Sequence, residues 1–166
     1  MKSNYHSHTT YCDGKNTPRE MILSAIEKGF DSFGFSAHGY TAFDLTYCVK
    51  DMDGYIKEIT ELKKEFKGKI DIYLGIEEDA FYLNDREKFD YIIGSSHYFN
   101  VGGKYYPIDS NPDCFKKCLE VFNYDVISLA DTYYKEFVSY IKRRKPDIVG
   151  HFDLITKFDE MGESLF

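Results

Sequence analysis

Short apolar segments alternate with amphipathic helical segments along this chain, and this alternation constrains the possible folds more than any other feature of the sequence. Residues 18–28 and 52–66 have the spacing of helices, and each is followed by a glycine and then by an apolar, strand-like segment. Strands joined by helices run parallel and are buried on both faces, so they read as nearly continuous apolar runs. With right-handed crossovers, such units form an α/β open sheet or a barrel.

Five strands and four helices are predicted. The strands are residues 2–5, 32–36, 70–76, 91–95 and 148–150, and the helices are residues 18–28, 52–66, 112–122 and 126–143. The first helix has Thr17 as its N-cap, Pro18 at its first position and Glu20 in a capping box. A length of 166 residues predicts a single domain, residues 1–166.

Composition restricts the partners and the compartment. The formal net charge of −7 disfavours binding to the phosphate backbone of a nucleic acid. No apolar run has the length of a membrane span, and the N-terminal residues do not resemble a signal peptide, so we expect a cytoplasmic protein. The cysteines form no CxxC pair and are expected to be reduced; Cys12 is interpreted as structural. The cysteines are Cys12, Cys48, Cys114 and Cys118.

All the histidines follow predicted strands. There are five, namely His6, His8, His38, His97 and His151, and the third strand leads into Glu77 and Glu78. The carboxyl ends of parallel strands meet at one edge of the sheet, where chemistry gathers in such folds. Imidazole and carboxylate are ligands of Zn²⁺, Mn²⁺ and Fe²⁺. Two histidines spaced as His-x-His on an extended segment point to one side, so a metal site is predicted at this edge.

The acidic residues near these histidines receive different interpretations. Glu77 ends an apolar strand, where an unpaired charge is costly, so it is the best candidate for a carboxylate that bridges two ions. Glu78 points the other way and is expected to be a solvated acid, for which Glu78→Gln would be nearly silent. Asp13 precedes Gly14 and is either a turn residue or a ligand.

Five segments resemble the motifs of the polymerase and histidinol phosphatase (PHP) superfamily, in the same order. They are HSHTTYCDG, FSAH, YLGIEEDA, IIGSSHYF and VGHFDLITKF. Within the superfamily the similarity is greatest to the histidinol-phosphate phosphatases. The resemblance implies a distorted (β/α)7 TIM-like barrel, here incomplete with about five βα units. The expected C-terminal strands and a final Ser-Asp-x-His-like motif have no match after His151.

The resemblance also implies a site with two or three divalent metal ions, either zinc, manganese or iron. The positions that match metal ligands are His6, His8, Asp13, His38, Glu77, His97 and His151, and Glu77 matches a bridging position. Lys157 falls where relatives carry a basic residue near the substrate phosphate, although a solvated lysine explains it equally well.

The activity implied by the resemblance is hydrolysis of a phosphomonoester, with L-histidinol phosphate of histidine biosynthesis as the favoured substrate. The general acid is not identified; Asp13 and Asp153 are candidates. Two alternatives stay open: another phosphoesterase, such as a nuclease or a protein-tyrosine phosphatase, and a metal-binding remnant without activity. Bare strand edges in an incomplete barrel also predict association between copies of the chain.

Overall fold

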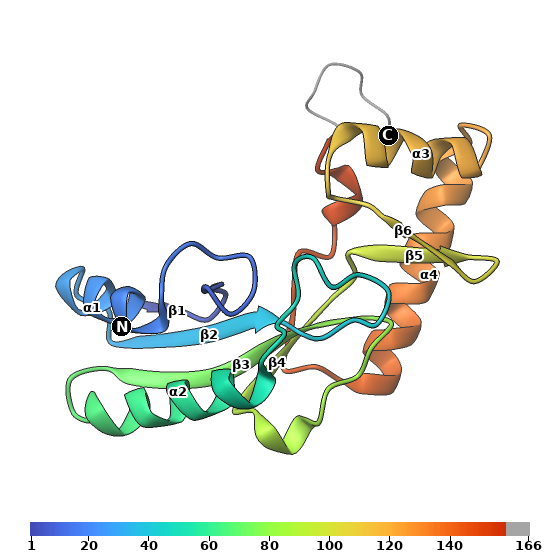
Figure 1. Ribbon diagram of the computed structural model, residues 1–166. Helices are drawn as coiled ribbons and strands as arrows, with labels where there is room; N and C mark the ends of the chain where they lie inside the picture. The colour runs from blue at the N-terminus through green and yellow to red at the C-terminus, as the bar shows by residue number, and fades with distance from the viewer. Residues whose placement is uncertain (159–166) are drawn as a thin grey trace. The chain divides into compact units, whose positions relative to one another are not determined.

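The computed structural model describes residues 1–158, which form two compact units (Figure 1). Unit 1 comprises residues 1–78, 82–93 and 146–148, and unit 2 comprises residues 79–81, 94–145 and the described residues from 149 onward. The prediction of a single domain over residues 1–166 stays a prediction. None of the helices in residues 1–158 combines the length and the apolar character that a membrane crossing requires.

The main sheet has five strands in the order β1-β2-β3-β4-β7. They are β1 (Ser3–Asn4), β2 (Ser32–His38), β3 (Asp71–Asp79), β4 (Tyr91–Ser95) and β7 (Ile148–Val149). The pairs β1–β2 and β2–β3 are parallel, as the alternation of strands and helices predicted. Since β1 and β7 are the two ends of this order, the described strands form an open sheet, and the predicted α/β fold of about five βα units is confirmed.

Two helices cover the sheet in unit 1, α1 (Pro18–Glu27) and α2 (Met52–Glu65), which lie along the strands in Figure 1. The capping box of Thr17 and Glu20 starts α1, as predicted. Ile22 of α1 and Tyr55 and Ile59 of α2 are completely buried in one core with strand residues such as Phe35. The hydrophobic effect of this burial fixes the helices against the strands and so fixes the strand ends that carry the histidines.

Tyr91 ties the strands of unit 1 together. Its ring packs where Gly75 has no side chain, and its hydroxyl lies 2.6 Å from the carbonyl oxygen of Tyr5 and 2.9 Å from that of Phe35. The hydroxyl carries a single proton, which the two carbonyl groups share. One side chain of β4 therefore holds the segment after β1 against β2.

Unit 2 contains a two-stranded antiparallel hairpin, β5 (Tyr98–Val101) and β6 (Lys104–Pro107), which the sequence analysis did not predict. The turn between the strands is Gly102–Gly103, and both glycines have positive φ, at 61° and 84°. Such a pair of residues suits the tight hairpin turns that need φ above zero at both positions. Two glycines between runs of tyrosine, phenylalanine and valine were the signal for this hairpin.

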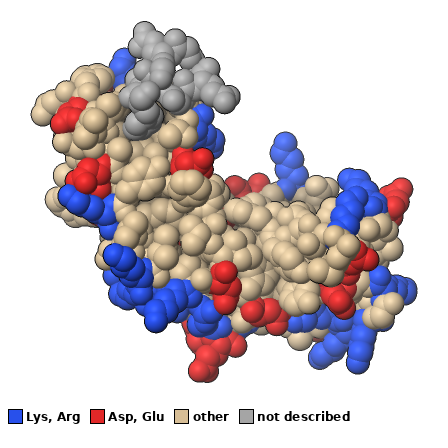
Figure 2. All heavy atoms as spheres, turned by 180° about the vertical axis from the view of Figure 1, so that it is seen from behind, with Lys and Arg blue, Asp and Glu red and all other residues tan. Residues whose placement is uncertain are grey.

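Two helices complete unit 2, α3 (Pro112–Val121) and α4 (Val126–Arg144). Their core is rich in aromatic residues: Tyr133 and Phe137 of α4 pack with Phe99 of β5 and Phe115 of α3. The described residues also form two short 3-10 helices, Arg86–Lys88 in unit 1 and Leu154–Thr156 in unit 2. Acidic and basic side chains both lie on the face of the molecule that Figure 2 shows.

Candidate metal centre

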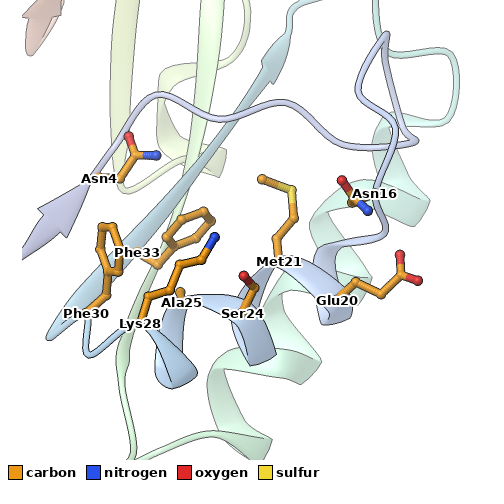
Figure 3. A pocket seen from close by; sticks show the side chains of 9 residues that line it. All are labelled: Asn4, Asn16, Glu20, Met21, Ser24, Ala25, Lys28, Phe30 and Phe33. Carbon is orange, nitrogen blue, oxygen red and sulfur yellow. The ribbon is translucent and has the colours of Figure 1, made fainter.

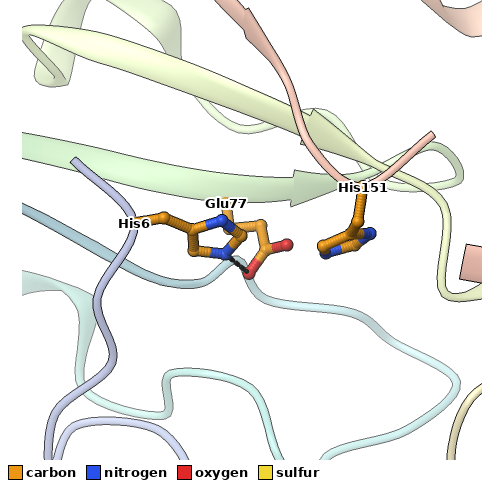
Figure 4. Close-up of side chains that lie close together, drawn as sticks. All are labelled: His6, Glu77 and His151. Carbon is orange, nitrogen blue, oxygen red and sulfur yellow. Dashed lines mark ion pairs between the residues drawn. The ribbon is translucent and has the colours of Figure 1, made fainter. Parts of the chain in front are cut away.

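Three imidazoles surround one carboxylate oxygen in unit 1. Oε2 of Glu77 lies 3.0 Å from Nε2 of His6, 3.3 Å from Nε2 of His8 and 3.2 Å from Nδ1 of His38. The Glu77 side chain is fully buried, whereas that of His6 is 36% exposed. Figure 4 shows the His6 ring directed at the Glu77 carboxylate. The three imidazole groups therefore converge on Glu77, the acid predicted from the sequence to lie at the site.

Strand register explains this convergence. His38 is the last residue of β2 and lies directly opposite Glu77 of β3 in the parallel ladder. His6 and His8 follow β1, and the residue between them faces the other way, with Ser7 Oγ donating to the Gly34 carbonyl at 2.7 Å. The His-x-His spacing thus places both rings on one side of an extended segment, as predicted.

Asp13 completes a second group of potential ligands. Its carboxylate lies 3.7 Å from Nδ1 of His8 and 3.6 Å from Nε2 of His38. The donor atoms of these three residues all lie within 4.8 Å of one another. A Cβ on Gly14 would overlap the backbone of His8 and Thr9, so the turn that returns Asp13 to the histidines requires glycine. Asp13 is therefore both a turn residue and a neighbour of the site.

The electrostatics of this group suit metal ions. Burial, with the neighbouring charge of His38, lowers the pKa of His8 from 6.5 to about 4, so its ring is neutral at pH 7. The neighbouring imidazole of His38 lowers the pKa of Asp13 to about 2, so Asp13 is ionised. Neutral imidazole and ionised carboxylate are the forms that bind divalent metals. The residues of unit 1 therefore fit a divalent cation.

Cys12 lies beside this group. Its Sγ is 3.7 Å from Nδ1 of His8, and burial raises the pKa of the thiol. All four cysteines are free in the structure, and their reduced state in the cell stays a prediction.

The other two histidines belong to unit 2. The rings of His97 and His151 have centroids 5.0 Å apart at an interplanar angle of 63°. His97 follows β4 and is 7% exposed, and His151 follows β7. Each of the five histidines thus ends or follows a strand of the main sheet, as predicted. Their assignment as metal ligands stays a prediction.

The interpretation of Glu78 as a solvated acid was wrong. Glu78 is completely buried, and its Oε2 accepts a hydrogen bond from the backbone N–H of Asn84 at 2.6 Å. The side chain does point away from that of Glu77, but both faces of a parallel sheet are covered, so this direction leads into the protein. Because β3 continues to Asp79 instead of ending at residue 76, Glu78 lies within the strand.

Two predicted polar residues near the C-terminal end of the described chain lie in unit 2. Nζ of Lys157 donates to the carbonyl oxygen of Asp109 at 2.8 Å and lies 3.4 Å from its carboxylate. Asp153, one candidate for the general acid, is exposed at the start of the 3-10 helix Leu154–Thr156. The substrate-binding role of Lys157 and the general-acid role of Asp153 stay predictions.

Two buried residues that contact a predicted ligand or the segment that carries one were not identified from the sequence, Tyr91 and Asp79. Asp79 is 3% exposed and contacts His97 through its carboxylate. The signal for Asp79 was its place two residues after Glu77, which puts the two side chains on the same face of the strand. The signal for Tyr91 lay in Gly34 and Gly75, which leave room for its ring only once the strand register is known.

A pocket of about 330 Å³ lies in unit 1 away from the histidines, beside α1 (Figure 3). Phe30 and Phe33 form its apolar wall, and Glu20 and Lys28 are its charged members. Glu20 already accepts hydrogen bonds from Thr17 in the capping box. The pocket contains no histidine or cysteine and is therefore separate from the candidate metal centre.

The chain matches the family model of the PHP domain over residues 4–165, nearly its full length. It belongs to the PHP domain family. The resemblance seen in the five motifs is thereby confirmed, together with the PHP-type α/β fold.

Curated relatives of the chain carry histidinol-phosphatase names. It is 28% identical to a probable histidinol-phosphatase of Schizosaccharomyces pombe and 29% identical to the histidinol-phosphatase of Bacillus subtilis, over 95% of this chain in each case. It is 30% identical to a probable histidinol-phosphatase of Deinococcus radiodurans over 94% of the chain. The chain spans 58%, 68% and 62% of the lengths of these three relatives, respectively.

Solved structures share the fold. A crystal structure described as a histidinol phosphatase from Listeria monocytogenes superposes with a TM-score of 0.81 at 25% identity, covering 98% of this chain and 71% of that one. Histidinol phosphate phosphatase from Lactococcus lactis, in complex with zinc, L-histidinol and phosphate, has a TM-score of 0.59 at 21% identity. That match covers 94% of this chain and 59% of the other.

Proposed function

We propose that this chain is a metal-dependent phosphomonoester hydrolase that acts on L-histidinol phosphate. The observation that carries the proposal is the arrangement of His6, His8 and His38 around the buried carboxylate of Glu77. Curated relatives with histidinol-phosphatase names support the choice of substrate.

We further propose that two or three divalent ions bind to this chain, with zinc, manganese and iron as the candidates. The proposed ligands are His6, His8, Asp13, His38, Glu77, His97 and His151. When bound, such ions neutralise charge on the phosphate oxygens and supply a nucleophile by lowering the pKa of water. Histidine and carboxylate ligands suit all three candidate metals, so the donor set does not choose among them.

The residues of the chain have separate tasks in this proposal. Glu77 supplies a negative charge that two ions can share, and its burial on β3 keeps that charge fixed in position. His8 supplies a neutral ring at pH 7 because burial lowers its pKa to about 4. Asp13 stays ionised well below neutral pH and adds a second negative charge beside His8 and His38.

Metal analysis and an assay on one sample test the proposal. The purified chain, loaded with Zn²⁺ or Mn²⁺ and desalted, should retain at least two ions per chain and release inorganic phosphate from histidinol phosphate. Metal retention without phosphate release would contradict the phosphatase activity and leave a metal-binding protein. Failure to retain any ion would contradict the metal centre itself.

A matched pair of variants tests the role of Glu77. Glu77→Gln removes the shared charge while keeping the size of the side chain, and loss of a ligand or its support typically weakens metal binding at least 10–100-fold. We expect both metal content and turnover to fall in this variant. Glu61→Gln, an exposed position on α2, is the control and should match the parent. Equal metal content in the two variants would refute the proposed role of Glu77.

A further inference from the structure

The loop between β2 and α2, residues 39–51, folds back onto the histidine that precedes it. The N–H of Val49 donates to the carbonyl oxygen of His38 at 2.9 Å, and the N–H of Gly39 donates to the carbonyl oxygen of Glu77 at 2.7 Å. Val49 is only 1% exposed. The two ends of the loop are therefore held at the carboxyl edge of the sheet in unit 1, beside the candidate ligands.

Hydrogen bonds within the loop brace its outer part. The hydroxyl of Thr41, a completely buried residue, donates to the carbonyl oxygen of Asp44 at 2.7 Å. Oδ1 of Asp44 in turn accepts the N–H of Thr46 at 2.9 Å and its hydroxyl at 2.6 Å. Short-range bonds of this kind hold a loop on one path. Tyr47, the next residue, therefore projects from a backbone of defined conformation.

The ring of Tyr47 packs against that of His38. The two ring centroids are 4.9 Å apart at an interplanar angle of 76°, which is an edge-to-face arrangement. The His38 ring also stacks on that of His8, with centroids 4.2 Å apart at 27°. The His38 ring thus has an aromatic neighbour from the loop as well as one from the segment after β1, and both resist its rotation about the Cβ–Cγ bond.

The orientation of the His38 ring decides which of its atoms face the acids of the site. Nδ1 lies 3.2 Å from Oε2 of Glu77, and Nε2 lies 3.6 Å from Oδ2 of Asp13. A half-turn of the ring would put carbon atoms in the places of both nitrogens, and this torsion has only a broad, roughly two-fold preference of its own. Contacts around the ring must therefore select the orientation that can bind a metal.

We infer that Tyr47 is a positioning residue of the metal centre: its ring holds that of His38 in the orientation that turns both nitrogens toward the acids. This inference rests on the proposed function for the role of His38 as a ligand. Loss of an aromatic contact of this kind should lower the population of correctly oriented rings by about 2–10-fold. The apparent affinity for one ion should fall by the same factor, because only that population binds.

The contact itself can be measured without metal or substrate. Nuclear Overhauser effects between ring protons of the chain in EDTA report which aromatic side chains touch, and comparison with His38→Gln assigns the His38 signals. We expect such effects between the rings of Tyr47 and His38. Their absence in the folded chain would overturn the inference, whatever the outcome of the activity assay.

Zinc affinity tests the consequence for the site. Competition with a chelator should show that Tyr47→Leu binds one ion about 2–10-fold more weakly than the parent, whereas Tyr47→Phe keeps the ring and should match the parent. Added to His38→Gln, Tyr47→Leu should cause no further loss, because both changes act on one ligand. Tyr40→Leu is the control, since it removes a ring from the same loop that packs on Tyr82 instead of a histidine.

Three results would each overturn the inference. They are parental affinity in Tyr47→Leu, an equal loss from Tyr47→Phe and Tyr47→Leu, and an equal loss from Tyr47→Leu in the parent and in the His38→Gln background. The last is what a general loss of stability would produce.

Failure of this inference and failure of the proposed function are distinguishable. A parent chain that binds no zinc refutes the proposed metal centre and the positioning role together. A parent that binds zinc and hydrolyses histidinol phosphate, with a Tyr47→Leu variant of unchanged affinity, keeps the proposed function and removes Tyr47 from it.

Discussion

Replacing Gly75 with alanine would place a methyl group inside the space that the Tyr91 ring occupies. A Cβ at this position would overlap Cζ and Cε1 of Tyr91 and lie 2.6 Å from Cε2. The ring cannot move aside easily, because it is 8% exposed and its hydroxyl is held between the carbonyl groups of Tyr5 and Phe35. We therefore expect Gly75→Ala to destabilise the protein.

The magnitude follows from two contributions. Overpacking of a core by a methyl group typically costs about 1–3 kcal/mol. Displacing the Tyr91 hydroxyl from its buried acceptors adds about 0.5–1.5 kcal/mol. The free energy of unfolding should then fall by about 2–4 kcal/mol, which for a chain of this size corresponds to a loss of roughly 5–15 °C in Tm. Because Tyr5 precedes His6, zinc affinity should fall as well.

Urea denaturation followed by circular dichroism, with EDTA present, measures the effect on the metal-free protein. The decisive comparison uses Tyr91→Leu, which removes the ring. If the methyl group clashes with Tyr91, Gly75→Ala should cost much less in that background than in the parent. A Gly75→Ala variant as stable as the parent, or an equal loss in both backgrounds, would refute the reasoning.

Three further predictions concern buried charge and bound metal. Glu78→Ala should destabilise the chain by about 1–3 kcal/mol, because it leaves the N–H of Asn84 without this acceptor. Glu78→Gln keeps an acceptor and should destabilise the chain less. Equal urea midpoints for Glu78→Ala and the parent would contradict this prediction. The folded-state pKa of His8 is lowered from 6.5 to about 4, so the folded chain binds this proton more weakly than the unfolded chain does. The free energy of unfolding should therefore be highest above pH 6.5 and fall by an amount on the order of 1–3 kcal/mol as the pH falls to 4. Urea midpoints at pH 7 and 4.5 in EDTA should show this loss, and His8→Gln should reduce it. Adding Zn²⁺ at about 100 times its Kd should stabilise the folded chain by about 2.7 kcal/mol over the EDTA-treated sample, and an unchanged Tm would argue against a specific site.

Much of the fold follows from local patterns in the sequence. The helix predicted at residues 18–28 is observed at Pro18–Glu27, because Thr17, Pro18 and Glu20 specify its start through short-range hydrogen bonds. The strand predicted at residues 91–95 is observed at Tyr91–Ser95. The hairpin of β5 and β6 was not predicted, although Gly102 and Gly103 indicate its turn, because its four-residue strands are partly exposed and lack the apolar runs of buried parallel strands.

The candidate site was predictable to the extent that it depends on strand ends. Glu77 and His38 converge because they lie opposite each other near the carboxyl ends of neighbouring strands, and these ends can be estimated from apolar runs. The contact between Asp13 and His38 depends instead on the path of a turn, which the sequence left open. Tyr91 was not predictable in the same way, because it supports the site through Tyr5. Its position depends on the strand register and on the space left by glycines, and both are known only once the strands are paired.

The three consecutive acids of β3 show why side-chain alternation alone could not assign their environments. Alternation predicted correctly that Glu77 and Glu78 point in opposite directions, but it does not say what covers each face of the sheet. In a parallel sheet both faces are covered, so Glu77, Glu78 and Asp79 are all nearly or completely buried. Each carboxylate then needs compensation of its own: histidines around Glu77, the Asn84 N–H at Glu78, and His97 at Asp79. A buried carboxylate is costly unless it is compensated by a neighbouring group. On this strand a backbone N–H compensates one of the three acids, and histidines lie beside the other two.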